Sequence, residues 1–341
     1  MRLQFILKKN QCYNFVHFCR RSSGLWNSVN FIANVLKGRG MEIDIVEVVD
    51  NNSIDREVTR FKPDVVIIEA LWVVPEKFDV LKRLHPKIKW CVRLHSHMPF
   101  LALEGIATHW IGDYLKRKVL IIANSKQMYE ALKPICGDNI IFIPNIYEGE
   151  MRLPDLREKM HVHIACLGAI RPLKNQLIQA LAAIKWAQEN KKYLYFHINS
   201  SRVEVGGEPV LKNLRYLFKN RSGTQLVEER WMEHEDLIEY LKKFDLGMQV
   251  SLSETFSIVS ADYLQAGIPL IASKEVEWAS SFSKAKDNDI NSMVKIMNRS
   301  YLNPLLVMWN QYLLKRDMKK ATKMWVNFCL DWDRKQHHHK A

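Results

Sequence analysis

The chain has 341 residues, a formal net charge of +13 and 48% hydrophobic residues. This is the composition of a soluble globular protein, and the length exceeds one ordinary core and suits two domains. No apolar run approaches the roughly 18 residues that a membrane-spanning helix needs, and the first run, Leu3 to Leu7, leads into Lys8 and Lys9 instead of a cleavage site. We therefore expect a cytoplasmic protein without a signal peptide.

Short apolar runs alternate with longer amphipathic stretches through the first half of the chain. The predicted strands are Arg2–Leu7, Ile43–Val48, Asp64–Ile68, Lys89–Leu94, Val119–Ile122 and Ile140–Ile143. The predicted helices between them are Leu25–Leu36, Pro75–Leu84, Thr108–Leu115 and Ser125–Leu132. Strands that are apolar throughout and separated by helices indicate a parallel sheet covered on both faces.

The same pattern restarts after a polar, proline-containing stretch, Tyr147–Met160, which is typical of an interdomain linker. Strands are predicted at Val162–Leu167, Tyr193–Ile198, Thr224–Val227, Leu246–Val250 and Pro269–Ala272. Helices are predicted at Asn175–Gln188, Pro209–Phe218, His234–Lys243 and Ile258–Gln265. The fold class is therefore α/β, with Rossmann-like domains at 1–150 and 151–300 and a ligand cleft at the carboxyl ends of their strands.

The last residues, 301–341, form a helical tail in this prediction, which folds back across the domain junction. Its aromatic and aliphatic residues recur at intervals that suit one apolar face. The residues assigned to that face are Trp309, Tyr312, Leu313, Met318, Trp325 and Phe328.

The most informative stretch runs from Ser251 to Pro269, after the strand that ends at Val250. Glu254 and Asp262 are eight residues apart, slightly more than two helical turns, so both side chains can lie on one side of the helix. A carboxylate at the loop can accept hydrogen bonds from sugar hydroxyls, and one two turns deeper can accept them from a ribose diol. The start of the helix offers unpaired N–H groups and a positive dipole to a phosphate.

A second loop, Gly168-Ala-Ile-Arg171-Pro-Leu-Lys174-Asn175, also lies between a predicted strand and a helix. A donor that leaves as a nucleoside diphosphate needs cations at its pyrophosphate. Arg171 can supply two hydrogen bonds to a phosphate and Lys174 a compact charge. A pair of charges on a surface turn is the alternative interpretation.

These two stretches resemble the donor motifs of retaining glycosyltransferases of the GT-B architecture, GT4 type, including phage-encoded ones. The first motif runs Ser-x-x-Glu-x-Phe-Gly, then an acidic residue eight after the Glu, then Gly-x-Pro. Here Asp262 stands for the usual Glu and Ser257, after Phe256, for the usual Gly. In the second motif Gly168 and Lys174 keep the family separation of six, while Arg171 is displaced.

The resemblance implies a role for the first domain on the acceptor side. The family has a His after the fourth strand, which His95 matches best, with His97 as second choice; its expected role is a hydrogen bond to the transferred sugar. Gly24 matches one glycine of a loop that approaches the donor phosphates. Either histidine could instead only cap its loop.

The implied reaction moves a hexosyl or pentosyl group from a nucleotide sugar, with a UDP-sugar as the expected donor, to a hydroxyl with retention of configuration. The resemblance implies that the leaving diphosphate takes the acceptor proton, and that Lys174, Arg171 and the helix dipole stabilise its charge. No metal is required by that scheme, and no cofactor is expected.

The acceptor stays open at this point. A hydroxymethylated base in DNA suits the basic chain, with Arg20, Arg21, Lys116, Arg117 and Lys118 as candidate phosphate contacts. A glycan or a lipid-linked sugar at a membrane surface is the alternative. Two further alternatives are a sugar-nucleotide epimerase of the same shape and a non-enzymatic nucleic-acid-binding protein, although no nucleic-acid-binding signature is found.

Overall fold

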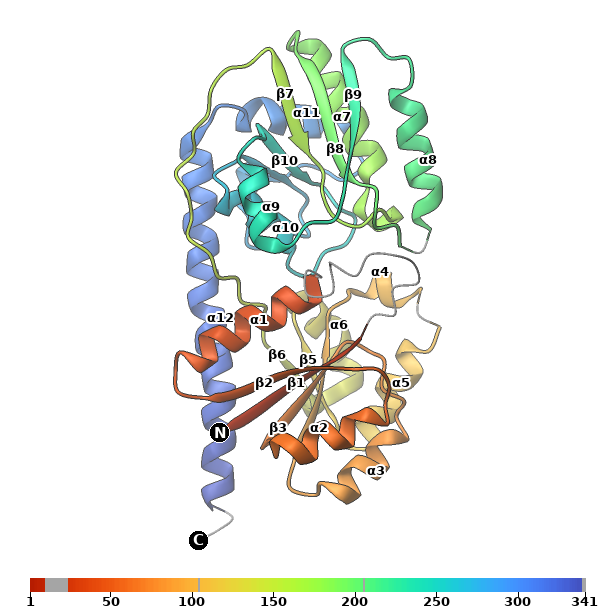
Figure 1. Cartoon of the computed structure of the whole chain (residues 1–341), viewed down its shortest axis with the longest axis vertical. Coiled ribbons are helices and arrows are strands. Elements are labelled where there is room, and N and C mark those ends of the chain that lie inside the picture. The colour runs from red at the N-terminus through yellow and green to blue at the C-terminus, as the bar shows by residue number, and fades with distance from the viewer. Residues whose placement is uncertain (10–23, 104, 205, 339–341) are drawn as a thin grey trace. The chain divides into compact units, whose positions relative to one another are not determined.

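The computed structural model describes residues 1–9, 24–103, 105–204 and 206–338. The chain divides into two compact units, one made of 1–148 with 318–341 and the other of 149–317. Each unit contains its own parallel sheet with helices around it (Figure 1). The predicted α/β class with two Rossmann-like domains is confirmed.

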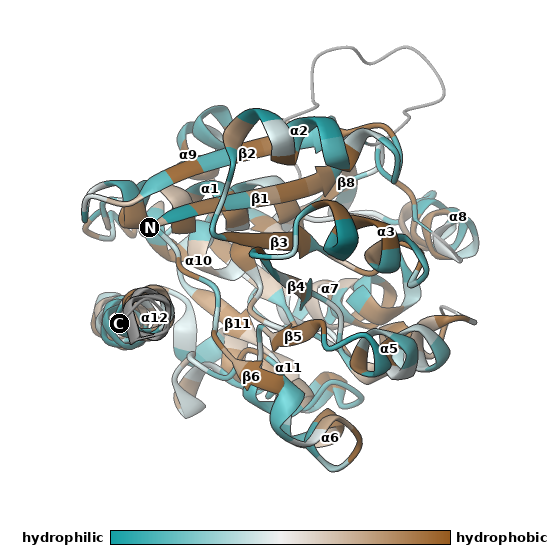
Figure 2. Ribbon diagram, turned by 90° about the horizontal axis from the view of Figure 1, so that it is seen from below, coloured by the Kyte–Doolittle hydropathy of each residue, from teal (hydrophilic) through white to brown (hydrophobic). Residues whose placement is uncertain are grey.

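The first unit contains a sheet of six parallel strands in the order β2-β1-β3-β4-β5-β6. The strands are β1 (Arg2–Lys8), β2 (Glu42–Val48), β3 (Val65–Glu69), β4 (Lys89–Leu94), β5 (Leu120–Ala123) and β6 (Ile140–Phe142). Figure 2 shows hydrophobic colouring along β1, β3 and β6. Every residue of β3 is buried, as expected for a strand covered on both faces.

The helices of the first unit connect these strands. They are α1 (Gly24–Lys37), α2 (Ser53–Phe61), α3 (Lys77–Leu84), α4 (Met98–Leu101), α5 (Ala107–Lys116), α6 (Lys126–Cys136) and the short η1 (Gly137–Asn139). The sequence analysis did not predict α2, although its buried residues Ile54, Val58 and Phe61 stand at i, i+4 and i+7. Asp50 Oδ1 accepts a hydrogen bond of 3.0 Å from the N–H of Ser53 at the start of this helix.

The second unit contains five parallel strands in the order β11-β10-β7-β8-β9. They are β7 (His161–Ala165), β8 (Tyr193–Asn199), β9 (Thr224–Glu229), β10 (Leu246–Gln249) and β11 (Leu270–Ala272). The helices are η2 (Pro172–Lys174), α7 (Gln176–Glu189), α8 (Gly207–Phe218), α9 (His234–Leu241), α10 (Ile258–Gln265), η3 (Ser281–Ser283) and α11 (Ile290–Ser300). Helices α7, α8 and α11 cover one face of this sheet, and α9 and α10 lie on the other (Figure 1).

The last helix, α12 (Pro304–His338), begins in the second unit and ends in the first, which confirms the predicted helix that crosses back. In the first unit Trp325 is fully buried, and its Nε1 donates a 2.8 Å hydrogen bond to the carbonyl of Pro144. The apolar face was predicted incorrectly at two positions. Trp309 is 47% exposed and Tyr312 is 55% exposed. The reason is that this part of α12 packs within the second unit through another side of the helix, which carries Leu306, Val307, Asn310, Gln311 and Leu314.

No helix among the residues that the structure describes is long and apolar enough to cross a membrane.

Candidate functional site

The candidate donor site lies at the carboxyl ends of β7 and β10. These strands are neighbours in the sheet but far apart in sequence, since β10 pairs with β7 through Leu246 and Gly247. The chain leaves β7 toward β8 on one side and leaves β10 toward β11 on the other. Such a reversal of strand order is where open α/β sheets bind ligands.

The loop after β7 is fixed on both sides. The Gly168 N–H donates to Asn199 Oδ1, at the end of β8, at 2.7 Å. The φ of Gly168 is 118°, which suits glycine. Asn175, at a left-handed φ of 58°, donates from Nδ2 to the carbonyl of Val250 at 3.0 Å. The loop that carries Lys174 is thus held against the end of β10.

Lys174 and Glu254 form a buried ion pair. The Lys174 ammonium contacts the Glu254 carboxylate directly and lies 3.4 Å from Gln249 Oε1, and the two charged side chains are 11% and 8% exposed. The fold therefore brings together the two predicted site residues from loops 80 residues apart. An ammonium and a carboxylate at this edge can serve a phosphate and a sugar hydroxyl, respectively.

Arg171 lies on the same loop but has another partner. Its Nη1 donates to Glu204 Oε2 at 2.9 Å, in the segment that follows β8. Arg202 also pairs with Glu204, at 3.0 Å, and lies over the ring of Trp231. The displacement of the arginine in sequence is thus accompanied by a contact with a carboxylate of the protein.

Phe256 and Ser257 lead into α10. The carbonyl of Phe256 accepts a 2.7 Å hydrogen bond from Trp278 Nε1, and the two rings lie 5.9 Å apart. Ser257 precedes the helix with φ 63° and ψ 79°, a left-handed conformation that favours glycine. This conformation gives a physical reason for the glycine that the family motif has at this position.

Asp262 faces His234, a residue that the sequence analysis did not assign to the site. His234 Nε2 lies 2.8 Å from Asp262 Oδ1, and the side chains are 18% and 2% exposed. Burial opposes protonation of His234, but the hydrogen bond and charge of Asp262 outweigh it and raise the pKa of His234 above its ordinary value. The two residues are 28 positions apart, and no periodicity of the sequence predicts this pair.

A buried polar network occupies the carboxyl ends of β3 and β4 in the first unit. Glu69 and Arg93 are both fully buried and lie 3.2 Å apart, and the Glu69 carboxylate also contacts His95 Nε2. Arg93 donates further to Ser28 Oγ at 3.1 Å and to Asn145 Oδ1. The sequence analysis did not assign Glu69 or Arg93 to a site, because Glu69 ends the apolar strand β3 and Arg93 lies within the apolar strand β4.

The ring of His95 is enclosed by this network. Its Nδ1 lies 3.5 Å from Asn124 Nδ2, so each ring nitrogen faces a protein group. Burial, aided by the charge of Arg93, lowers the pKa of His95 and favours the neutral ring. The alternative residue, His97, lies 2.7 Å from Ser125 Oγ.

The remaining predicted residues are the glycine proposed for the donor phosphates and the basic residues proposed to contact DNA. Gly24 is exposed at the start of α1, and Arg20 and Arg21 lie outside the described residues. Lys116 pairs with Asp113 at 2.8 Å, and Arg117 pairs with Asp79 at 3.0 Å. These pairs neutralise part of the predicted basic rim.

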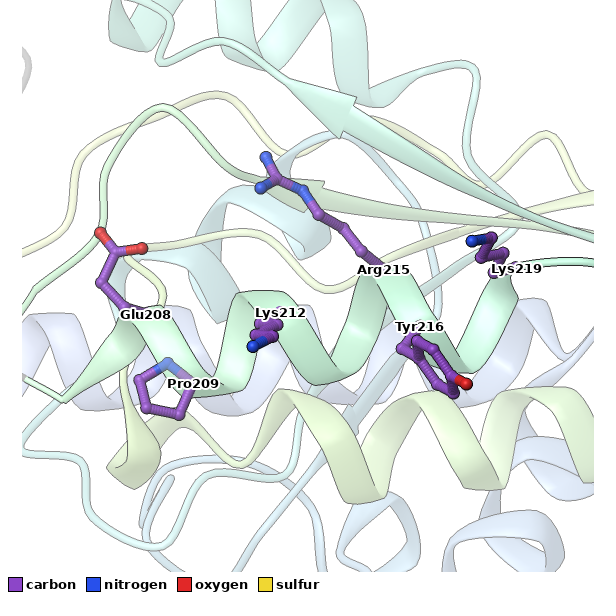
Figure 3. Close-up of a pocket in the computed structure, with 6 residues that line it drawn as sticks. All are labelled: Glu208, Pro209, Lys212, Arg215, Tyr216 and Lys219. Carbon is purple, nitrogen blue, oxygen red and sulfur yellow. The ribbon is translucent and has the colours of Figure 1, made fainter.

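A shallow hollow lies along α8 on the surface of the second unit (Figure 3). Its lining consists of Glu208, Pro209, Lys212, Arg215, Tyr216 and Lys219. None of these residues belongs to the predicted donor site. Within the described part of the chain, no group of three or more His, Cys, Asp and Glu side chains is arranged to hold a metal ion.

No family model matches the sequence, and no curated protein matches it. Solved structures do match the fold. The OtsA apo structure covers 97% of this chain and 99% of its own at a TM-score of 0.70 and 10% identity. Trehalose-6-phosphate from E. coli bound with UDP-2-fluoro glucose matches 96% of this chain with 98% of its own, at a TM-score of 0.68 and 11% identity. S. aureus TarM G117R, in complex with fondaparinux, α-GlcNAc-glycerol and UDP, matches 78% of this chain with 55% of its own, at a TM-score of 0.59 and 13% identity.

At such identities the likeness establishes the fold. The chain has the two-domain GT-B architecture, as the motif resemblance predicted.

Proposed function

We propose that this protein is a glycosyltransferase that takes a sugar from a nucleoside diphosphate donor bound in its second unit. The observation that carries the proposal is the buried Lys174–Glu254 pair beside Gln249, where β7 and β10 end. Burying a charged pair costs free energy, so a buried pair is more often retained where both charges serve a function. The end of parallel strands, where this pair lies, is a common place for a ligand.

The donor is proposed to be a UDP-sugar. Two of the similar structures hold a UDP-sugar analogue or UDP, and the motif with Glu254 and Asp262 is the basis of the resemblance. In this assignment Glu254 accepts hydrogen bonds from sugar hydroxyls, Asp262 binds the ribose diol, and Lys174 binds the diphosphate.

The chemistry is transfer with retention of configuration. The bond between the anomeric carbon and the diphosphate oxygen breaks, and the acceptor oxygen forms its bond to that carbon from the same face. The acceptor proton passes to the leaving diphosphate oxygen. Lys174 and the N-terminal end of α10, after Ser257, stabilise the negative charge that grows on this oxygen. The scheme requires no metal.

The acceptor is proposed to be a carbohydrate hydroxyl. The similar proteins are trehalose-phosphate synthases and TarM, the latter held with α-GlcNAc-glycerol. The described residues favour DNA as the acceptor less, because Lys116 and Arg117, two of the proposed phosphate contacts, pair with carboxylates of the protein.

The test is isothermal titration with UDP, GDP and ADP, followed by hydrolysis of a panel of nucleotide sugars with and without carbohydrate acceptors and hydroxymethylated DNA. We expect binding of UDP that Lys174→Ala weakens, and sugar release that a carbohydrate hydroxyl accelerates. Absence of binding to every nucleoside diphosphate would remove the proposal. Acceleration by modified DNA alone would restore the DNA alternative.

A further inference from the structure

Helix α12 carries an exposed apolar stripe on its first two turns. Leu305, Met308, Trp309 and Tyr312 are 76%, 46%, 47% and 55% exposed. They stand at i, i+3, i+4 and i+7, so they lie on one side of the helix. The rings of Trp309 and Tyr312 stack with centroids 5.3 Å apart.

The opposite side of the same turns is fixed to the second unit. Asn310 is fully buried and bonds both the Ser280 N–H and Ser283 Oγ at 2.8 Å. Gln311 donates to the carbonyl of Leu264 at 2.8 Å. The stripe therefore faces outward because the polar anchors face inward, and α12 cannot turn its apolar residues under without breaking these bonds.

Basic residues continue the stripe. Lys315 and Arg316 follow Tyr312 by three and four residues and are exposed, which places them on the same side of the helix. The next turns add exposed Lys319, Lys320 and Lys323. Segment 281–283, beside Asn310, presents Phe282 at 57% exposure with Arg299 stacked on its ring at 5.6 Å.

We propose that this surface, Leu305, Met308, Trp309, Tyr312, Lys315 and Arg316, docks the second unit on an anionic lipid bilayer. Indole and phenol rings next to aliphatic side chains suit the boundary between headgroups and acyl chains, and the following cations suit anionic headgroups. A nucleic acid would use the cations but would leave the aliphatic groups without a partner. The inference does not depend on the proposed donor chemistry.

The hollow on α8 provides a matched control. It also presents an exposed aromatic ring, Tyr216, beside Lys212 and Lys219 on one exposed helix (Figure 3). Its described lining has Pro209 beside Tyr216 and no Leu, Met or Trp side chain, and its Arg215 is paired with Glu228 through two hydrogen bonds of 2.8 Å.

The experiment is co-sedimentation of the full chain with phosphatidylcholine vesicles, with and without phosphatidylserine, over a salt series. We expect binding to the anionic vesicles that salt weakens. The double variant Trp309→Ala/Tyr312→Ala should bind about tenfold more weakly or worse, because two rings no longer enter the bilayer. Lys315→Glu/Arg316→Glu should lose a similar factor on anionic vesicles and little on neutral ones. The α8 variant Lys212→Glu/Tyr216→Ala should bind like the parent.

Three results would overturn the proposal. The first is a parent that binds neither kind of vesicle. The second is an equal loss in the α8 variant, which would indicate a general charge effect. The third is a dimer, or a complex with duplex DNA, that dissociates in Trp309→Ala/Tyr312→Ala while vesicle binding is unchanged. Thermal melts of each variant control for folding.

Discussion

The imidazole of His234 and the carboxylate of Asp262 meet at 2.8 Å, at the start of α9 and in the second turn of α10. The carboxylate proposed for the ribose is therefore bonded to a histidine of the protein. The Asp262 side chain is only 2% exposed, so a ribose diol reaches it only if the His234 contact changes.

Nucleotide binding should therefore depend on pH. The pKa of His234 is raised in the folded protein, so the stability that this contact contributes is complete below the ordinary value of 6.5 and is lost as pH rises through the raised pKa. The charged groups that act on His234 are Asp262 and Glu235. A ligand that displaces the contact should bind more tightly as pH rises, measured by titration with UDP. His234→Ala should flatten this dependence. Weaker binding in that variant would show that His234 itself contacts the nucleotide.

Asp262→Ala should weaken nucleotide binding by about 1–3 kcal/mol, because it removes a charge-assisted hydrogen bond. The measurement is the same titration, at a pH where His234 is neutral. An affinity equal to that of the parent would show that Asp262 serves only to orient His234.

Glu254→Ala should abolish transfer and also destabilise the second unit. Lys174 would remain buried without its carboxylate, which costs about 3 kcal/mol for a pair of this kind. Denaturant unfolding measures the loss, and the double variant Lys174→Met/Glu254→Gln should recover most of the stability while staying inactive. Turnover at the parent's rate in Glu254→Ala would remove the donor-site assignment.

Lys174→Ala should lower kcat more than it raises KM, because charge on the leaving diphosphate grows toward the transition state. Arg171→Ala should have a milder effect, since Arg171 pairs with Glu204. Steady-state kinetics on both variants provide the comparison. A higher KM with normal kcat in Lys174→Ala would assign it to ground-state binding.

Ser257→Gly should leave nucleotide binding intact and raise the free energy of unfolding by up to about 1 kcal/mol, because a left-handed φ of 63° is costly for serine. The lost 2.8 Å contact between the Ser257 and Ser260 hydroxyls offsets part of the gain. Ser257→Val should destabilise the protein. Equal melting temperatures for the glycine and valine variants would contradict this account.

Glu69→Gln should lower the stability of the first unit by about 3 kcal/mol, because Arg93 is buried and would lose its counter-charge. Burial opposes ionisation of Glu69, but Arg93 and His95 outweigh it and hold the pKa of Glu69 below its ordinary value. The stability that ionised Glu69 contributes is therefore present above pH 4.5 and is lost as pH falls through the lowered pKa. The free energy of unfolding of the variant should not show this loss at acid pH. Glu130→Gln, on an exposed pair with Lys126, is the control and should unfold like the parent.

The sequence by itself predicted the architecture and supplied most of the residues proposed for the donor site. Apolar runs such as Val65–Glu69 are legible because a strand buried on both faces needs every residue apolar, apart from its end. Glu254, Asp262 and Lys174 could be proposed from the sequence because the loop after a strand and the first turns of a helix are local in sequence. The direct contact between Lys174 and Glu254 comes from the strand order, which places β7 beside β10.

Only the tertiary structure decided which groups pair with those residues. His234 and Asp262 are 28 residues apart and Glu69 and His95 are 26 apart, and no periodicity relates such positions. The outward direction of Trp309 was likewise decided by tertiary contacts. Helix α12 has apolar residues on several sides. The side that it buries carries Leu306, Val307 and Leu314 together with Asn310 and Gln311, whose hydrogen bonds fix the rotation of the helix.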